Sequence, residues 1–113
     1  MNENYKLSRT ITTVVQVWKE WDTGLTSNTE AVSRLEAVLG NSWRKDQKER
    51  KIFSLRKVII DSILQVSETR NRTGLQVATM FEVRRDQLGK SLSALTKILS
   101  RPESKDAFVA SIP

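Results

Sequence analysis

The chain has 113 residues, with 19 Lys and Arg against 13 Asp and Glu, and it contains neither Cys nor His. Its length suits one domain with one hydrophobic core, and its net charge of +6 favours a polyanionic partner. Without Cys or His the chain cannot form disulfides, zinc fingers, thiol nucleophiles or imidazole bases. No apolar run is long enough to span a bilayer, so we expect no membrane partner.

The chain begins with a polar stretch, residues 1–9, which we predict to be a flexible arm. A first helix is predicted over about residues 10–22, because apolar side chains recur there on one face at helical spacing. These side chains are Ile11, Val14, Val15, Trp18 and Trp21. Gly24 follows them and is typical of a helix end.

A second helix is predicted over about residues 28–39. Ser27 and Glu30 have the spacing of a capping box, and Gly40 marks the end of the pattern. Residues 20–42 carry an excess of acid. We therefore expect this part of the fold to face away from a polyanion or to pair with basic neighbours.

The longest predicted helix covers about residues 46–67. Its apolar positions recur at steps of three and four and so share one face. They include Ile52, Leu55, Ile59, Ile63 and Val66. The window 44–57 overlaps the start of this helix and holds seven Lys or Arg against two acids, which is five of the six net positive charges. Charge concentrated on one element indicates a nucleic-acid binder.

A polar break at residues 68–72 separates this helix from the carboxyl-terminal part of the chain. Thr73 and Gln76 form a second capping-box match, and a fourth helix is predicted from there to about residue 85. Gly89 then interrupts the helical pattern.

A fifth helix is predicted over residues 91–99, with Ser91 as its cap. Residues 101–113 lack a clear apolar face, and we predict a disordered tail. The expected fold class is therefore all-α, with about five helices in a single domain over residues 10–100.

No constellation of residues predicts catalysis. Gly89, Lys90 and Ser91 match the end of a phosphate-binding loop, but Arg84 stands where that motif requires its upstream Gly. We expect no enzyme activity, no metal and no cofactor.

The basic helix is the main functional signal. Arg50, Ser54 and Lys57 share one face, and we predict that they face bases in a major groove. We predict phosphate contacts for the cations at the start of the helix, which are Arg44, Lys45, Lys48 and Lys51. A solvated charged face on a structural helix is the alternative interpretation of this pattern.

Two further arginines have less regular positions. Arg56 projects into the apolar face, so we expect it to pair with an acid such as Glu20 or Glu36, and it could also reach a phosphate. Arg9 could reach the DNA backbone from the arm.

The three tryptophans have the helical spacing of core residues, which favours burial over stacking on single-stranded bases. They are Trp18, Trp21 and Trp43. Tryptophans spaced through three helices resemble a Myb-type helix-turn-helix unit, and we predict such a unit over residues 10–67.

Residues 76–92 weakly match a second helix-turn-helix, with Arg84, Arg85 and Lys90 as secondary DNA contacts. The alternative is a pair of helices that braces the long basic helix and touches only the DNA backbone.

These residues resemble a fungal family, the DNA-binding domain at the carboxyl end of the activator of glycolytic genes, shared with factors of osmotic stress and filamentous growth. The matching segments are residues 5–10, Thr13-Val14, Trp18-Lys19-Glu20-Trp21, Gly24, Gly40, Trp43-Arg44, Arg50, Phe53 and residues 56–60. One departure is Leu55, which takes a position that is often basic in the family.

The resemblance implies sequence-specific binding of double-stranded DNA at short C/T-rich promoter elements, in the nucleus. It also implies recruitment of the transcription machinery by regions outside this chain. We expect a monomer, because no sustained heptad pattern is present. A helical protein-interaction module with a basic face for an acidic partner is the alternative function.

Overall fold

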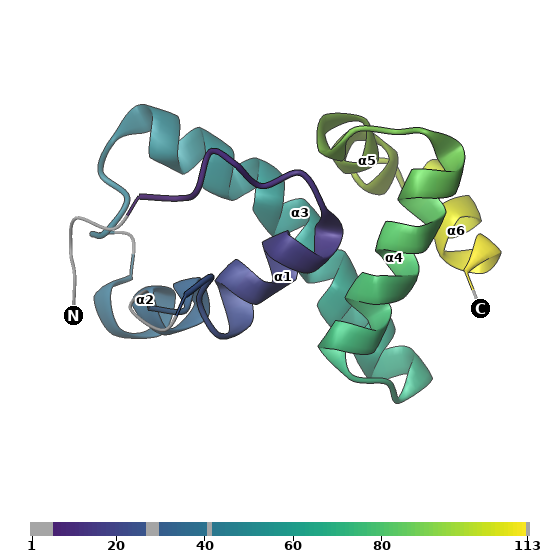
Figure 1. The fold of residues 1–113 in the computed structure, drawn as a ribbon, viewed down its shortest axis with the longest axis horizontal. Helices are drawn as coiled ribbons and strands as arrows, with labels where there is room; N and C mark the ends of the chain where they lie inside the picture. Colours follow the sequence, from purple (N-terminus) through teal and green to yellow (C-terminus); the bar gives the residue numbers. More distant parts are fainter. Residues whose placement is uncertain (1–5, 27–29, 41, 113) are drawn as a thin grey trace.

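The computed structural model describes residues 6–26, 30–40 and 42–112, and over these residues the fold is all-α (Figure 1). The described helices are α1 (Val14–Asp22), α2 (Val32–Leu39), α3 (Gln47–Arg70), α4 (Gly74–Leu88), α5 (Leu92–Leu99) and α6 (Pro102–Ser111). The predicted fold class is confirmed, but the number of helices is higher than the five predicted. The predicted cap at Ser27 and the first five residues of the predicted arm lie outside the described residues.

Several predicted helix starts are confirmed by their caps. Thr73 and Gln76 form a capping box at the start of α4, and the Ser91 hydroxyl accepts a hydrogen bond from the Ala94 amide at the start of α5. The first helix begins later than predicted, because Thr13 caps it in a capping box with Gln16.

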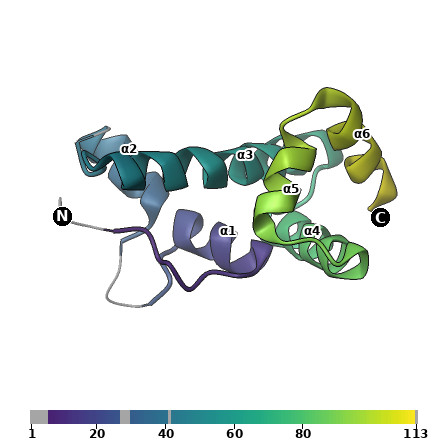
Figure 2. The same cartoon turned by 90° about the horizontal axis from the view of Figure 1, so that it is seen from above.

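The long helix α3 runs along much of the length of the molecule (Figure 2) and contributes residues to both core clusters. The Asp46 carboxylate caps its first turn by accepting a hydrogen bond from the Lys48 amide at 2.7 Å. The helix ends at Asn71, which adopts a left-handed conformation with φ of 53°.

The core is divided in a way that the sequence did not predict. The main cluster joins α1, α3, α4, α5 and α6, whereas α2 packs in a smaller cluster with the arm and the start of α3. The smaller cluster contains Leu7, Val32, Leu35, Trp43 and Phe53. The predicted division into a three-helix unit and a bracing pair therefore differs from the division of the core, because α1 packs on α4 as well as on α3.

The prediction of a disordered tail is wrong, because residues 102–111 form α6. Phe108 is buried and meets the Phe81 ring edge-on at a centroid distance of 5.2 Å. Arg70 at the end of α3 donates a hydrogen bond to the Val109 carbonyl at 2.8 Å. Pro102 is the first residue of the helix, because its fixed φ suits that position. Elsewhere in a helix a Pro interrupts the backbone hydrogen bonds, so from the sequence alone Pro102 argues against a helix.

A close approach between α1 and α4 depends on Gly74. A Cβ atom built on Gly74 would overlap the six-membered ring of Trp18, with Cε2 and Cη2 at 2.6 Å and Cζ2 nearer still. Trp18 is itself buried in the main core, so its ring has little room to move. The absence of a side chain at position 74 therefore sets how closely the two helices pack.

We predict that Gly74→Ala destabilises the fold by about 1–3 kcal/mol, despite the better helix propensity of Ala. Chemical denaturation would measure this loss. The same substitution in a Trp18→Phe background provides the control, because Phe removes part of the overlapping ring. An equal loss in both backgrounds would show that the overlap with Trp18 is not the cause.

Glu82 of α4 acts as a cap for α1 from a neighbouring helix. Its Oε1 accepts a hydrogen bond from the Val14 amide, the first residue of α1, at 2.9 Å. The Arg85 guanidinium binds both carboxylate oxygens, at 2.8 Å and 2.5 Å. The hydrogen bond from Arg85 lowers the pKa of Glu82 below its ordinary value; burial opposes this shift and the Val14 amide reinforces it.

The pKa of Glu82 is lower in the folded state than in the unfolded state. Its negative charge therefore stabilises the fold fully when the pH is above the ordinary Glu pKa. This contribution is lost as the pH falls through the folded-state pKa. We predict that Glu82→Gln lowers the free energy of unfolding at pH 7 by about 0.5–2 kcal/mol, the range for a helix cap, and by less at acidic pH. Chemical denaturation at pH 7 and at acidic pH measures the loss under each condition. Glu103→Gln, which changes an exposed carboxylate, is the control. A loss that is independent of pH would contradict the prediction.

Candidate nucleic-acid interface

Glu20 of α1 carries a buried carboxylate that holds three segments of the chain together. Its side chain is only 2% exposed, although the sequence places it on the polar side of α1. It accepts hydrogen bonds from Arg56 at 2.7 Å and from the Ser8 amide at 2.8 Å. The other terminal nitrogen of Arg56 donates to the Ser8 carbonyl. The predicted ion pair of Arg56 is therefore confirmed with Glu20, and it joins α1, α3 and the arm.

A second buried carboxylate, Glu49, explains why the arm is ordered. Glu49 accepts the Leu7 amide at 3.3 Å and both terminal nitrogens of Arg9, at 3.2 and 3.0 Å. Leu7 is 3% exposed and belongs to the smaller core cluster. The prediction of a flexible arm is therefore wrong for residues 6–9, because a buried carboxylate needs donors and the arm supplies them.

A third carboxylate, Glu36 of α2, organises the approach to α3. It accepts hydrogen bonds from the Trp43 indole at 2.8 Å and from Arg44 Nε at 2.7 Å. The Arg44 guanidinium also lies 4.4 Å from the centre of the Phe53 ring, a cation–π contact. The expectation that acids of this region pair with basic neighbours is confirmed for Glu20 and Glu36.

These three ion pairs separate the basic residues into two groups. Arg9, Arg44 and Arg56 already have carboxylate partners that hold the fold together. Arg44 and Arg56 are also mostly covered, with side chains that are 19% and 15% exposed. Their charge is therefore largely compensated within the protein.

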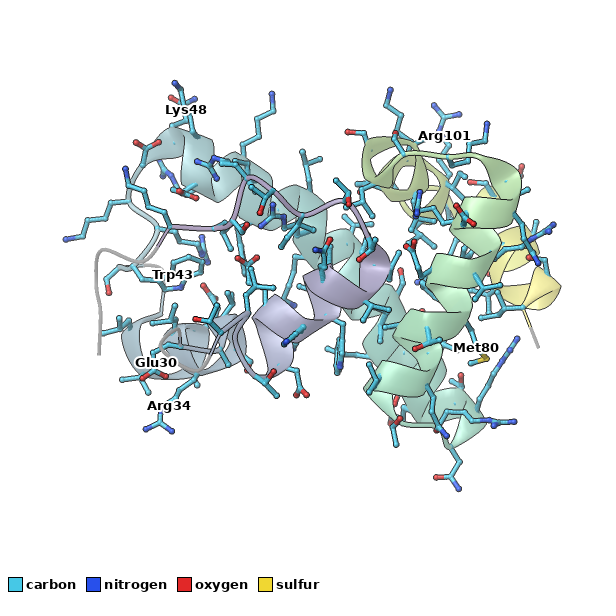
Figure 3. The ribbon with its side chains drawn as sticks, viewed as in Figure 1. Glu30, Arg34, Trp43, Lys48, Met80 and Arg101 are labelled. Atoms are coloured by element: carbon cyan, nitrogen blue, oxygen red, sulfur yellow. The ribbon has the colours of Figure 1, made fainter. Side chains whose placement is uncertain are left out.

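The other predicted cations around the start of α3 remain open to solvent, and Figure 3 shows Lys48 pointing away from the molecule. They are Lys45, Lys48, Arg50 and Lys51, all exposed. Among the described residues, none of the four has a carboxylate within ion-pair distance. The opposite face of this part of α3 is occupied by buried Glu49 and Phe53. The structure thus places four cations without an ion-pair partner within seven residues, with Lys45 just before α3 and the other three on its first turns.

Ser54 and Lys57 continue this exposed side of α3 with less free charge. The Ser54 hydroxyl donates to the Arg50 carbonyl at 2.9 Å, which leaves its oxygen able to accept a further hydrogen bond. Lys57 pairs with Asp61 at 2.5 Å and lies 5.3 Å from the centre of the Trp21 ring. Lys57 therefore shares its charge with an exposed acid, a pairing that stabilises a helix only weakly.

The tryptophans belong to the core, as predicted from their spacing. Trp18 and Trp43 are buried, and Trp21 is half-buried against both core clusters. Trp43 meets the Phe53 ring edge-on with 5.6 Å between the centroids. Neither buried ring is free to stack on a base.

A helix-turn-helix over residues 76–92 would need its turn at Glu82, where that motif usually has Gly. No turn is present there, because α4 is one continuous helix through that position. Arg85 pairs with Glu82, and Arg84 donates to the Ser111 hydroxyl at 3.1 Å. Lys90, in the connection between α4 and α5, is exposed. The alternative of a supporting helical pair describes this region better.

Other kinds of site find no support in the described part of the chain. No three of its Asp and Glu residues gather in a group that could hold a metal ion. Within the same residues, no helix combines the length and the apolar character needed to cross a bilayer.

Comparisons with known proteins point to transcription factors rather than to enzymes. Residues 5–85 match the family described as "Transcriptional activator of glycolytic enzymes". Transcription factor-like protein EUC1 of Saccharomyces cerevisiae (strain ATCC 204508 / S288c) is 34% identical over 74 residues, which is 66% of this chain and 16% of that protein. No solved structure gives a significant match. Because the family match spans well over half of the chain, this protein belongs to the family of transcriptional activators of glycolytic enzymes.

Proposed function

We propose that this chain is a sequence-specific domain for double-stranded DNA from a nuclear fungal transcription factor. The observation that carries the proposal is the group of four free cations at the start of α3, Lys45, Lys48, Arg50 and Lys51. Their charges are uncompensated, whereas the three neighbouring arginines are paired within the fold. A phosphate backbone is the polyanion that such a group neutralises.

The proposed docking element is the amino-terminal half of α3. An α-helix with its side chains is about 10–12 Å wide, and the major groove of B-DNA is about 12 Å wide. In this half of α3 the exposed side carries Arg50 and Ser54, whose side chains are long and short respectively. Arg50 can donate two hydrogen bonds to a guanine, and Ser54 lets the helix backbone approach the base edges.

The lysines have a different proposed role. Lys45, Lys48 and Lys51 contact phosphates, because an ammonium acts as a point charge without base specificity. Lys57 lies at the border of the exposed side and can exchange its weak pairing with Asp61 for a base or phosphate. Arg9, Arg44 and Arg56 are not included, because their carboxylates hold the arm, α2 and α1 against α3.

Family membership supports promoter DNA as the partner and the nucleus as the location. If the site is a short C/T-rich element, its complementary strand is rich in purines, and Arg50 would read a guanine on that strand. The match covers 16% of the yeast relative, so we assign activation functions to regions beyond this domain. We propose that the domain binds as a monomer.

Selection of bound duplexes from a random pool identifies the cognate site and supplies the duplex for a quantitative test. We predict that Arg50→Ala weakens binding to the cognate duplex by about 1–3 kcal/mol and has less effect on a scrambled duplex. Lys48→Ala should weaken both duplexes alike and make the salt dependence of log K less steep by about 0.9.

These two variants are matched controls for each other, because both remove one exposed cation from α3. Equal losses for Arg50→Ala on both duplexes would remove Arg50 from the base-reading role. Binding of the unmodified chain that is weak and the same for all duplexes would instead favour a protein-interaction module for an acidic partner.

A further inference from the structure

The stretch of chain around α5 has an unusual charge pattern. Residues 87–102 contain no acid, and they contain the cations Lys90, Lys97 and Arg101. All three are exposed, and among the described residues none has a carboxylate within ion-pair distance. Lys97 and Arg101 are not among the DNA contacts predicted from the sequence, although the absence of acid over 16 residues is a signal that could have indicated them.

The packing of α5 fixes which side of it faces outward. Leu95, Thr96 and Leu99 are buried against the core. Ser93 and Lys97 are exposed and are four residues apart, so they lie one turn apart on the same outward side. Arg101 follows after a further four residues and is also exposed. The outward side of α5 is thus short, polar and cationic.

This side of α5 adjoins the basic half of α3. The Thr96 hydroxyl contacts the Leu55 carbonyl at 3.5 Å. Ser93 of α5 and Leu55 of α3 line the same shallow cavity of about 170 Å³. Lys48 and Lys51 lie on the flank of α3 that carries Leu55, at positions seven and four residues before it. One line of exposed residues therefore leads from the α3 lysines across Leu55 to α5.

The figures place the two cationic groups on one edge of the molecule. In Figure 3, Lys48 and Arg101 both lie along the upper edge, whereas Arg34 of α2 lies along the lower edge. Figure 2 looks onto the upper edge and shows α5 beside α3. The opposite flank of α3 differs in charge, because Asp61 lies there with Lys57 and is 59% exposed.

We propose that Lys97 on the outward side of α5 and Arg101 at the start of α6 are the main contacts of a second phosphate-binding surface for the same DNA duplex. This inference rests on the proposed function of α3. With α3 in the major groove, the flank that carries Lys48 and Lys51 faces one sugar–phosphate backbone, and α5 extends that contact along the duplex. The other flank carries Asp61 beside Lys57, and this exposed carboxylate makes that flank less suited to a backbone contact.

The test compares two arginines in exposed positions. Arg101→Gln should make the salt dependence of log K less steep by about 0.9 and weaken binding roughly fivefold to tenfold at 0.1 M salt. Arg34→Gln is the matched control, because it removes the same charge from the opposite edge of the molecule. Its weak, exposed pairing with Glu30 contributes little to stability, so both variants should remain folded.

A second measurement locates the contact on the DNA. Methylphosphonates placed one at a time in the cognate duplex neutralise single phosphates. We expect one position at which neutralisation weakens binding of the unmodified chain but has no further effect on Arg101→Gln. Lys97→Gln should show the same behaviour at the same or a neighbouring phosphate.

The outcomes separate this inference from the proposed function. If Arg101→Gln and Arg34→Gln have equal effects, or neither has any, α5 does not bind phosphate. If Lys48→Ala still lowers the salt dependence in that case, only the inference about α5 is overturned. If neither Lys48→Ala nor Arg101→Gln changes the salt dependence of log K, the proposed function of α3 fails together with the inference.

Discussion

The burial of two carboxylates, Glu20 and Glu49, is the constraint on which the rest of the structure depends. A buried carboxylate is stable only when donors surround it, and both find them in the arm and in arginines. Glu20 joins α1 to α3 through Arg56, and Glu49 holds the arm against α3 through Arg9. Polar contacts therefore hold the inward side of the amino-terminal half of α3 against the arm and α1, while the outward side of this half stays exposed.

This constraint also separates structural from functional charge. An arginine that completes a buried carboxylate has little charge left for a partner. Arg9 and Arg56 are used in this way, and Arg44 is paired with the partly buried Glu36. The lysines and Arg50 stay in solvent, where a charge is inexpensive to maintain and free to neutralise a phosphate. The positive window seen in the sequence thus contains two populations. Only the cations without a carboxylate partner form a surface that continues towards α5. The cations that are bound to carboxylates hold the arm, α1 and α2 against α3.

Much of the fold could be predicted from local patterns. The apolar spacing and caps gave the helices around Thr73 and Ser91, and the tryptophan spacing gave a buried Trp18. Most long-range contacts could not be predicted in this way. The sequence offered Glu20 or Glu36 as the partner of Arg56, and only the structure identifies Glu20. The pairing of Arg9 with Glu49 joins residues 40 positions apart and has no local signal. The sixth helix was missed for a related reason, since its few apolar residues become significant only when Phe108 meets Phe81. For the candidate site, the sequence indicated the basic helix but not which of its cations are free.

The central claim is that the paired arginines stabilise the fold and the unpaired cations bind DNA. The most direct test is to replace Arg56 and to measure stability and DNA binding in the same variants. Arg56→Gln leaves the Glu20 carboxylate buried without its ion-pair partner, and we predict a loss of about 3–5 kcal/mol in the free energy of unfolding. Glu20→Gln/Arg56→Gln should recover part of that loss, and this double variant should bind duplex DNA with an unchanged salt dependence. Native-like stability of Arg56→Gln, together with a less steep salt dependence in both variants, would contradict the structural role of Arg56 and place it among the DNA contacts.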